Sequence, residues 1–223
     1  MQNELLNYKN LLDISQTLSG ELFLNTQFPW EVISEIKEYI LKIGPQLPKS
    51  EYKEFKPGVW ISKYAEVFES AYIGSPAIIQ ANAKIRHCAF IRGAVIVGEN
   101  VVVGNSTEIK NSILFNNVQV PHFNYIGDSI LGYKAHMGAG AIISNVKSDK
   151  SNVNVTIKNT KINTYLRKFG AIVGDYVEIG CNAVLNPGTI IGRNTTIYPT
   201  SMVRGTIEEN KIVKNTSNIV SKY

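Results

Sequence analysis

The sequence has few of the residues on which disulfide scaffolds and metal centres depend. Its 223 residues include two cysteines, Cys88 and Cys181, and three histidines, His87, His122 and His136. The two cysteines lie far apart in the chain, so we expect no structural disulfide. No two histidines have the spacing that a shared metal ion would need, so we expect no metal site.

Long apolar runs are also missing. No stretch approaches the roughly 20 apolar residues that a membrane-spanning helix needs, and the first residues lack the charged-then-apolar pattern of a secretion signal. The formal net charge of +5 is spread along the chain, without the interleaved aromatic and basic residues of a nucleic-acid motif. We therefore expect a cytoplasmic protein with no membrane or nucleic-acid partner. Its basic balance would also suit a phosphorylated small ligand.

What the chain does have is a six-residue period. Counting in sixes from Ile61 to Ile109, nine consecutive positions are Ile or Val. The position two residues earlier is small or β-branched in every repeat. The pattern returns over residues 173–203, and residues 131–143 keep the spacing in a shifted frame. A hexapeptide period of this kind predicts a parallel β-helix.

Six residues suit one side of a triangular coil, a short strand followed by a corner. Because side chains alternate along a strand, the aliphatic residue and the small residue two places before it both point inward. Hexapeptide-repeat families wind to the left, so we expect a left-handed parallel β-helix. Glycine follows the aliphatic residue in many repeats, where we expect corners with positive φ: Gly74, Gly98, Gly104, Gly132, Gly138, Gly174, Gly180 and Gly192.

The residues before the period differ from the rest. Residues 1–56 do not repeat, and apolar residues spaced along one helical face predict a helix over residues 31–43. A second short helix is expected around residues 5–18. We expect this segment to form a helical cap beside the first coil, shielding its open edge or contacting another subunit.

The β-helix itself is expected over residues 57–206. Within it, residues 144–171 interrupt the period, and alternating apolar residues on either side of a turn predict an inserted arm with a protruding β-hairpin. Residues 207–223 carry no recognisable repeat and are expected to be an irregular C-terminal tail. Interruptions of a regular scaffold are where function tends to lie.

A group of polar residues and glycines lies in the middle of the repeats. His122, Tyr125, Gly127 and Asp128 form a His-x-x-Tyr-x-Gly-Asp motif, and a Gly-Ala-Gly and an Asn follow within 20 residues. Over residues 85–205 the sequence resembles the C-terminal acetyltransferase domain of the bifunctional uridyltransferase/glucosamine-1-phosphate acetyltransferase. The family also has an Arg before a Gly-Ala pair, which matches Arg92 in the Ile-Arg-Gly-Ala stretch at residues 91–94. Its Val-Glu-x-Lys stretch resembles Thr-Glu-Ile-Lys at residues 107–110.

The resemblance implies roles for five side chains. His122 would be the general base that takes a proton from the acceptor amine, work for which an imidazole is suited near neutral pH. Arg92 and Lys110 would bind the sugar phosphate through charge-assisted contacts. Tyr125 and Asn145 would complete the catalytic site by positioning the sugar and the acyl group.

The resemblance also implies a site for acetyl-CoA, the cosubstrate. Backbone donors at Gly138, Ala139 and Gly140 would bind the thioester carbonyl or the pantetheine amides. Cys181 matches a serine-bearing stretch that lines this site in the family, so its backbone would matter more than its thiol. Arg204 could meet the 3′-phosphate of coenzyme A.

Taken together, the sequence predicts an acetyl-CoA-dependent sugar N-acetyltransferase that acts as a homotrimer, with active sites in the clefts between prisms. The acceptor would be a glucosamine-1-phosphate-like amino-sugar phosphate or a nucleotide sugar, as in UDP-N-acetylglucosamine biosynthesis. No Gly-rich, Arg-containing nucleotide-binding start precedes the repeats, so no uridyltransferase activity is expected from this chain. The alternative is a non-catalytic trimeric module that binds a nucleotide sugar or a partner protein.

Overall fold

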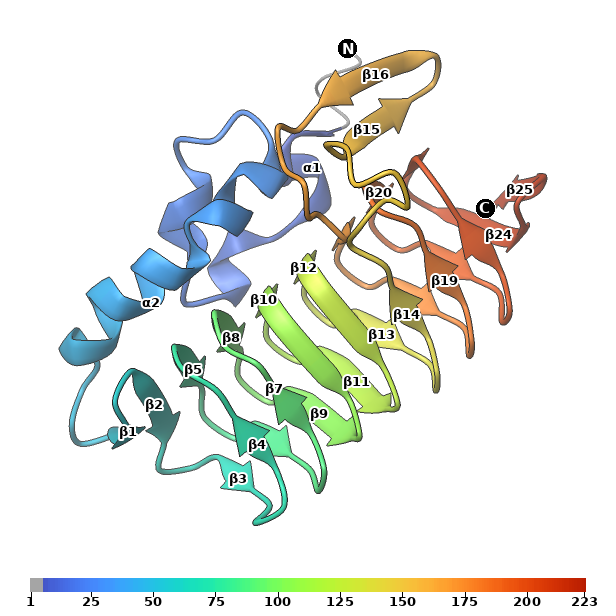
Figure 1. Ribbon diagram of the computed structural model, residues 1–223. Coiled ribbons are helices and arrows are strands. Elements are labelled where there is room, and N and C mark those ends of the chain that lie inside the picture. Colours follow the sequence, from blue (N-terminus) through green and yellow to red (C-terminus); the bar gives the residue numbers. More distant parts are fainter. Residues whose placement is uncertain (1–5) are drawn as a thin grey trace.

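The computed structural model describes residues 6–223, which form a left-handed parallel β-helix flanked by helices and a hairpin (Figure 1). The hexapeptide period therefore predicted the fold class correctly. Short strands stack on three faces of a prism, all in parallel between neighbouring coils.

Face one stacks β2 (Val59–Ser62), β5 (Ala77–Ile79), β8 (Val95–Val97), the second halves of β10 (Glu108–Leu114) and β12 (Tyr125–Leu131), β17 (Ala171–Val173), β20 (Thr189–Ile191) and β23 (Thr206–Ile207). Face two stacks β3 (Glu66–Val67), β6 (Lys84–Ile85), β9 (Val102–Asn105), β11 (Gln119–His122), β13 (His136–Met137), β18 (Glu178–Ile179), β21 (Thr196–Ile197) and β24 (Lys211–Asn215). Face three stacks β4 (Tyr72–Ile73), β7 (Phe90–Ile91), the first halves of β10 and β12, β14 (Ile142–Ile143), β19 (Val184–Leu185) and β22 (Met202–Val203).

The predicted aliphatic row fills the interior of the prism. Its members from Ile79 to Ile109 are fully buried, while Val67, in the open first coil, is 37% exposed. Threonines of the small row bond to carbonyls within the prism. Thr195 Oγ1, for example, donates to the carbonyl of Glu208 at 3.0 Å. The apolar interior thus accepts a polar atom only where a partner satisfies it.

The reason predicted for glycine at these corner positions is wrong. The glycines that follow the aliphatic residues do not have positive φ; in most of these repeats that conformation falls two residues later, on asparagine in three of them (Asn100, Asn182 and Asn194) and on other residue types elsewhere. The glycines are needed because the next coil is close. A Cβ on Gly104 would lie 1.6 Å from the carbonyl oxygen of Pro121 in the coil above. Close backbone approach, rather than a turn, selects glycine at these corners.

Two coils of the β-helix, each one residue shorter than the coil before them, explain the shifted frame of the repeat. Ala77 pairs with Val95, 18 residues on, but Val95 pairs with Ser112 and Ser112 with Ser129, each 17 residues on. The corner between faces three and one is one residue shorter in these two coils. For this reason β10 and β12 each continue around that corner without a break. Positive φ persists at Asn111 and Asp128. This tightened corner carries the polar cluster described below.

The N-terminal segment lies along the prism and does not cap its end, contrary to expectation. It contains α1 (Tyr8–Leu11), three 3₁₀ helices at 14–16, 20–23 and 29–34, α2 (Ile36–Ile43) and a 3₁₀ turn at 44–46. The chain runs back against the coil direction, above β12, β10 and β8 in Figure 1. Its apolar face is as predicted, because Ile33, Ile36 and Ile40 are buried. The segment therefore shields the corner between faces three and one.

At each end of the prism an antiparallel strand pairs with one edge strand. β1 (Tyr52–Lys56) pairs with β2 before the first coil, and β25 (Asn218–Ser221) folds back on β24 after the last. The irregular tail expected over residues 207–223 is thus a further coil closed by a hairpin. The repeat is hard to read there because the inward residue Ile207 follows Val203 by four residues instead of six. These terminal hairpins cover edges that would otherwise pair with another chain.

The inserted arm contains the predicted hairpin, formed by β15 (Asn154–Ile157) and β16 (Thr160–Asn163). It projects from the prism in Figure 1, but one side of it packs against β20 and β23 of the same chain. Val153 and Val155 are fully buried there. The arm is therefore held against its own prism by apolar contacts.

Asp175 fastens the N-terminal segment to the prism. Its buried carboxylate accepts hydrogen bonds from the backbone N–H groups of Asp13, at 2.7 Å, and Tyr133, at 2.8 Å, and lies 3.2 Å from Arg193 Nε. One carboxylate thus joins three separate parts of the chain.

We expect Asp175→Asn to lower the free energy of unfolding by about 1–3 kcal/mol, because the amide leaves a buried donor unpaired. Urea denaturation and amide exchange over residues 8–16 would measure the loss. Asp13→Asn keeps the local cap and is the control, expected to change stability by less than about 0.5 kcal/mol. Equal stability of the two variants would contradict this role for Asp175.

Candidate functional site

His122 lies at the edge between faces two and three, where β11 ends. We call this the His122 edge. Its backbone N–H donates to Asn124 Oδ1 at 3.2 Å, and its carbonyl accepts from the Gly140 N–H at 3.0 Å. The side chain is exposed, and no side chain in residues 6–223 hydrogen-bonds to its imidazole. The ring is therefore free to meet a ligand.

The predicted acetyl-CoA residues Gly138, Ala139 and Gly140 lie on the same edge, in the coil after His122. Next along it comes Cys181, which is exposed and unpaired. A Cβ on Gly138 would lie 2.7 Å from the Cys181 backbone nitrogen, so the two corners are in contact. The fold thus brings four predicted cofactor residues beside the predicted base.

A second group of predicted residues surrounds Asp128 at the edge between faces three and one, which we call the Lys110 edge. The Asp128 carboxylate lies 3.3 Å from Lys110 Nζ and accepts from Asn111 Nδ2 at 2.9 Å and from the Asn145 amide. Asp128 is 4% exposed and Asn145 is 7% exposed. Both side chains are largely withdrawn from solvent and contact neighbouring side chains.

Tyr125 connects this cluster to the open surface of face three. Its hydroxyl donates to Asn145 Oδ1 at 3.4 Å. Burial raises the pKa of Tyr125 above its ordinary value, and the negative charges of Glu108 and Asp128 act in the same direction. The phenol is therefore a neutral hydrogen-bond donor at physiological pH.

Glycine at position 127 makes the contact between Tyr125 and Asn145 possible. Gly127 pairs with Lys110 of the preceding coil. A Cβ there would lie 2.6 Å from the Asn145 amide nitrogen and 2.8 Å from the Tyr125 hydroxyl. The absent side chain leaves room for the two polar groups to meet.

Arg92 precedes Lys110 by one coil and points to the same edge. Its guanidinium bonds to Glu108 Oε1 at 2.9 Å, and about half of its side chain (47%) is exposed. An open ion pair of this kind is weak in water, so the guanidinium can exchange its partner for a ligand.

A cavity of about 400 Å³ adjoins Arg92, Lys110 and Asp128. Its other wall is the N-terminal segment, which contributes Ser34, Lys37 and Glu38. Asp128, Glu108 and the N-terminal wall have no role predicted from the sequence. One sequence signal could have indicated this cluster. Asn111 and Asp128 are polar residues at corners, and they lie 17 residues apart.

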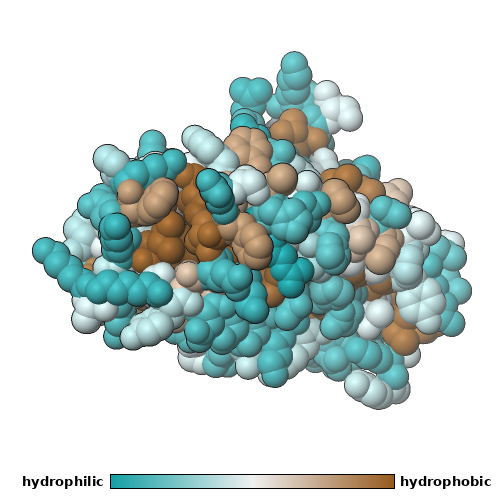
Figure 2. Space-filling view, turned by 90° about the horizontal axis from the view of Figure 1, so that it is seen from below, coloured by the Kyte–Doolittle hydropathy of each residue, from teal (hydrophilic) through white to brown (hydrophobic). Residues whose placement is uncertain are grey.

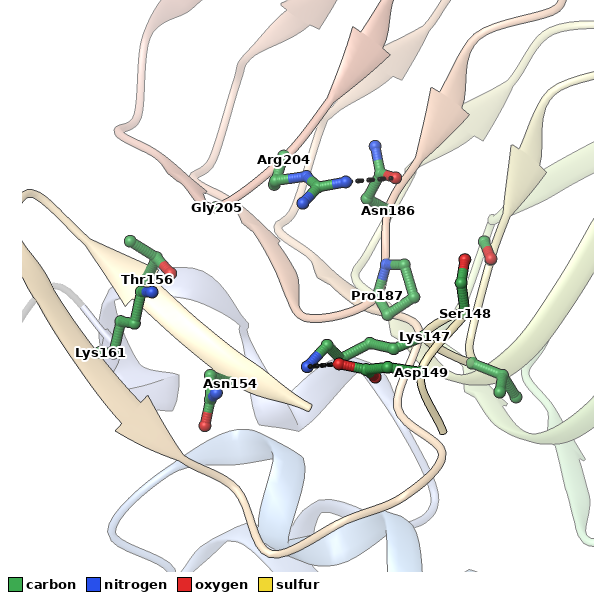
Figure 3. Close-up of a pocket in the computed structure, with 12 residues that line it drawn as sticks. Lys147, Ser148, Asp149, Asn154, Thr156, Lys161, Asn186, Pro187, Arg204 and Gly205 are labelled. Atoms are coloured by element: carbon green, nitrogen blue, oxygen red, sulfur yellow. Dashed lines mark hydrogen bonds and ion pairs between the residues drawn. The ribbon is translucent and has the colours of Figure 1, made fainter. Parts of the chain in front are cut away.

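Arg204 is not brought together with the other predicted cofactor residues. It follows β22 on the Lys110 edge, whereas Gly138 and Cys181 lie on the His122 edge. Its guanidinium is 3.4 Å from Asn186 Oδ1, and it lines a separate cavity under the arm (Figure 3).

No group of three or more histidine, cysteine or acidic side chains in residues 6–223 is arranged to hold a metal ion. None of the helices within that range is long and apolar enough to cross a bilayer.

Comparison with known proteins gives matches to two family models. Residues 72–163 match the GMPPB C-terminal domain family, and residues 170–205 match the bacterial transferase hexapeptide family of six repeats. The bifunctional protein GlmU of Methanococcus vannielii is 36% identical over 113 residues, which are 51% of this chain and 27% of that protein. This chain is a hexapeptide-repeat protein that resembles the acetyltransferase domain of GlmU.

Other relatives agree in kind. The bifunctional sugar-1-phosphate nucleotidylyltransferase/acetyltransferase of Sulfurisphaera tokodaii is 36% identical over 94 residues, 42% of this chain and 23% of that protein. The chain thus spans less than a third of the length of both curated relatives. Among solved structures, the acetyltransferase domain of PglB from Neisseria gonorrhoeae aligns with 80% of this chain and 62% of its own, at 16% identity and a TM-score of 0.32.

Proposed function

We propose that this chain is an acetyl-CoA-dependent acetyltransferase acting on an amino-sugar phosphate or a nucleotide sugar, with His122 as the general base. One observation carries the proposal. Face three has the exposed imidazole and the Gly138–Gly140 corner at one edge, and the Arg92, Lys110 and Tyr125 side chains at the other. An acceptor bound across face three would reach from the Arg92 and Lys110 cations to the His122 imidazole.

In the proposed reaction the acceptor amine attacks the carbonyl carbon of the thioester. The new C–N bond forms as the C–S bond breaks, the amine proton passes to the His122 imidazole, and coenzyme A leaves as a thiolate that is then protonated. Backbone donors at the Gly138–Gly140 corner would stabilise the oxyanion that develops on the carbonyl. Cys181 would border the pantetheine through its backbone.

Arg92 and Lys110 would hold the phosphate of the acceptor, and Tyr125 would donate a hydrogen bond to its sugar. Asn145, buried and bonded at both ends of its amide, would act by positioning Tyr125. The family resemblance would place this reaction in cytoplasmic UDP-N-acetylglucosamine synthesis.

We further propose a homotrimer whose clefts contain the active sites. Apolar side chains near the His122 edge are open to solvent in the single chain: Phe68 is 40%, Phe90 41% and Phe123 61% exposed. Seen from the side opposite the N-terminal helices, apolar side chains gather among polar ones over the first coils (Figure 2). Packing against a second prism would bury them.

One observation favours the non-catalytic alternative. A histidine base is usually oriented by a hydrogen bond to its second nitrogen, and no group in residues 6–223 supplies one to His122. If a neighbouring subunit does not supply it either, the prism would serve as a trimeric module that binds a nucleotide sugar or a partner protein.

A thiol-release assay with acetyl-CoA separates the two functions. The acceptor panel begins with glucosamine 1-phosphate and continues with other amino-sugar phosphates and amino-sugar nucleotides. Acceptor-dependent release would support the transferase and name its acceptor. Absence of release with every acceptor, from protein shown to be trimeric, would favour the binding module.

Removing the Arg92 charge tests the acceptor site. We expect Arg92→Gln to raise KM for the phosphorylated acceptor about tenfold through the loss of one charge-assisted contact, with a much smaller change for the dephosphorylated sugar. Lys84→Gln is the matched control, since Lys84 forms a similar open pair with Glu66 on face two. Equal effects of both variants would rule out an acceptor phosphate at Arg92.

A further inference from the structure

The inserted arm carries the whole net charge of the chain. Residues 144–171 contain six of the 23 lysines and arginines but only one of the 18 aspartates and glutamates. The rest of the chain therefore has equal numbers of acidic and basic residues. Because the formal net charge of +5 belongs to this one segment, attraction of the protein to an anionic surface would act through the arm.

Five of the six cations in the arm lack a counter-charge. Lys147 pairs with Asp149 at 3.3 Å. The other five are exposed and form no ion pair with any group in residues 6–223: Lys150, Lys158, Lys161, Arg167 and Lys168. With no carboxylate paired to them, their positive potentials add over the arm.

The arm presents these cations on a fixed protrusion. The β15–β16 hairpin projects beyond the prism in Figure 1, with Lys158 in its turn. Arg167 and Lys168 follow in the segment that returns to β17. Burial of Val153 and Val155 holds the other side of the hairpin against the prism. A flat surface that approaches from the side of the hairpin would therefore meet the arm first.

The arm also exposes a single aromatic ring, that of Tyr165, which is 82% exposed. The Tyr165 backbone lies in the left-handed region, with a φ of 59°. Its N–H donates to Asn163 Oδ1 at 2.8 Å, and the N–H of Leu166 donates to Thr164 Oγ1 at 3.2 Å. These bonds hold the turn that directs the ring to solvent. Tyrosine close to lysine and arginine is a typical combination at the interface between a bilayer and water.

A bilayer fits this arrangement better than a nucleic acid does. Anionic lipids diffuse in the plane of the membrane, so cations spread along a protrusion need no fixed spacing. Each cation within a Debye length of the surface adds to the binding. A single-stranded nucleic acid is instead held by several aromatic rings on which successive bases stack, and the arm exposes only one.

We propose that the arm binds the surface of an anionic lipid bilayer, with Lys158, Arg167 and Lys168 at the anionic headgroups and Tyr165 at the headgroup boundary. The proposal concerns contact with the bilayer surface and does not depend on acetyl transfer at His122. The expectation of no membrane partner rested on apolar runs and on charge counted over the whole chain, and neither is a test of contact through one basic segment.

The test is co-sedimentation of the full chain with vesicles. One set is phosphatidylcholine alone, and the other is equal parts of phosphatidylcholine and phosphatidylserine. We expect binding to the anionic vesicles alone, weakened by added salt. The triple variant Lys158→Gln/Arg167→Gln/Lys168→Gln should lower the partition constant about fivefold for each cation removed, on the order of 100-fold in total. Tyr165→Ala should also weaken binding, by a factor that added salt does not change.

The matched control is Lys49→Gln/Lys53→Gln/Lys63→Gln. It removes the same charge from three exposed lysines around β1 and the first coil, away from the arm, and should leave the partition constant nearly unchanged. His122→Ala should bind vesicles as the unmodified chain does, so a failure of acetyl transfer and a failure of this contact are separable.

Three results would overturn the proposal. The first is absence of binding to the anionic vesicles. The second is an equal loss of binding in the two triple variants, which would mean that net charge alone attracts the protein. The third is binding of a single-stranded DNA oligonucleotide through the arm cations in place of vesicles, which would make a nucleic acid the partner.

Discussion

His122→Ala is expected to lower kcat/KM for acetyl transfer by about 10²–10⁴-fold, the usual contribution of a positioned general base. The side chain is exposed at the start of face three, beside the Gly138–Gly140 corner that we assign to the thioester. Loss of the imidazole removes the proton acceptor and leaves the backbone in place. Binding of acetyl-CoA should therefore be unchanged.

The other two histidines provide matched controls. The His87 ring lies near that of Phe68 in a tilted arrangement, with ring centroids 5.8 Å apart, and His136 bonds to Glu178 at 2.8 Å. Alanine at either position should leave activity within about threefold, as expected for surface substitutions of small energetic effect. Added imidazole should partly restore His122→Ala if the ring acts as a base. Activity of that variant close to the unmodified level would end the case for His122 catalysis.

The sequence predicted the fold well because the period is strong. Most hexapeptides place Ile or Val at an inward position and Leu or Met fills the others, so the interior is a stack of apolar side chains. The helix over residues 31–43 was similarly predictable from the spacing of Ile33, Ile36 and Ile40. Only its first turns differ, since they wind as a 3₁₀ helix over Pro29–Ser34.

The six-residue period could not predict two features of the fold. The course of the N-terminal segment along the prism depends on contacts with distant coils, such as the backbone bond from Asp175 to Leu11 and the packing of Phe23 on Phe115. The last coil uses Ile207 and Val213 as inward residues, but they are offset from the earlier sixes. A longer segment of regular repeats would have been needed to reveal it.

The candidate site was predicted residue by residue but not as an arrangement. The six-residue register would place Lys110 and Asp128 in equivalent positions, 18 residues apart. The dropped residue at each tightened corner instead puts Asp128 opposite Asn111, so that Lys110, Asn111 and Asn145 all converge on one carboxylate. Arg204 is the opposite case, since the resemblance assigned it to the cofactor together with Gly138 and Cys181, while the coil places it on the other edge, so its cofactor role stays a prediction.

Asp128→Asn is expected to cost about 3 kcal/mol of stability, because it removes the charge partner of a mostly buried lysine. The Lys110 side chain is only 18% exposed, and asparagine would also turn an amide toward the donors of Asn111 and Asn145. Asparagine tolerates the positive φ of this corner, so the loss would report on charge and hydrogen bonding. Urea denaturation at fixed protein concentration measures it.

Glu108→Gln is the matched control for this loss of charge. Glu108 lies in the same coil as Lys110 and pairs with Arg92 of the preceding coil, but both side chains are open to solvent, with 33% and 47% exposed. A pair of this kind contributes about 0–1 kcal/mol. Similar destabilisation in the two variants would mean that burial does not set the importance of Asp128.

The double variant Asp128→Asn/Lys110→Met separates the structural role of the cluster from its functional one. With both charges removed, the uncompensated ammonium disappears and stability should recover in large part. Activity should not recover, because the phosphate of the acceptor has lost its lysine and Asn145 no longer has a carboxylate to hold it beside Tyr125. Recovery of both stability and turnover would show that Asp128 and Lys110 serve the fold alone, and would move the acceptor site away from the Lys110 edge.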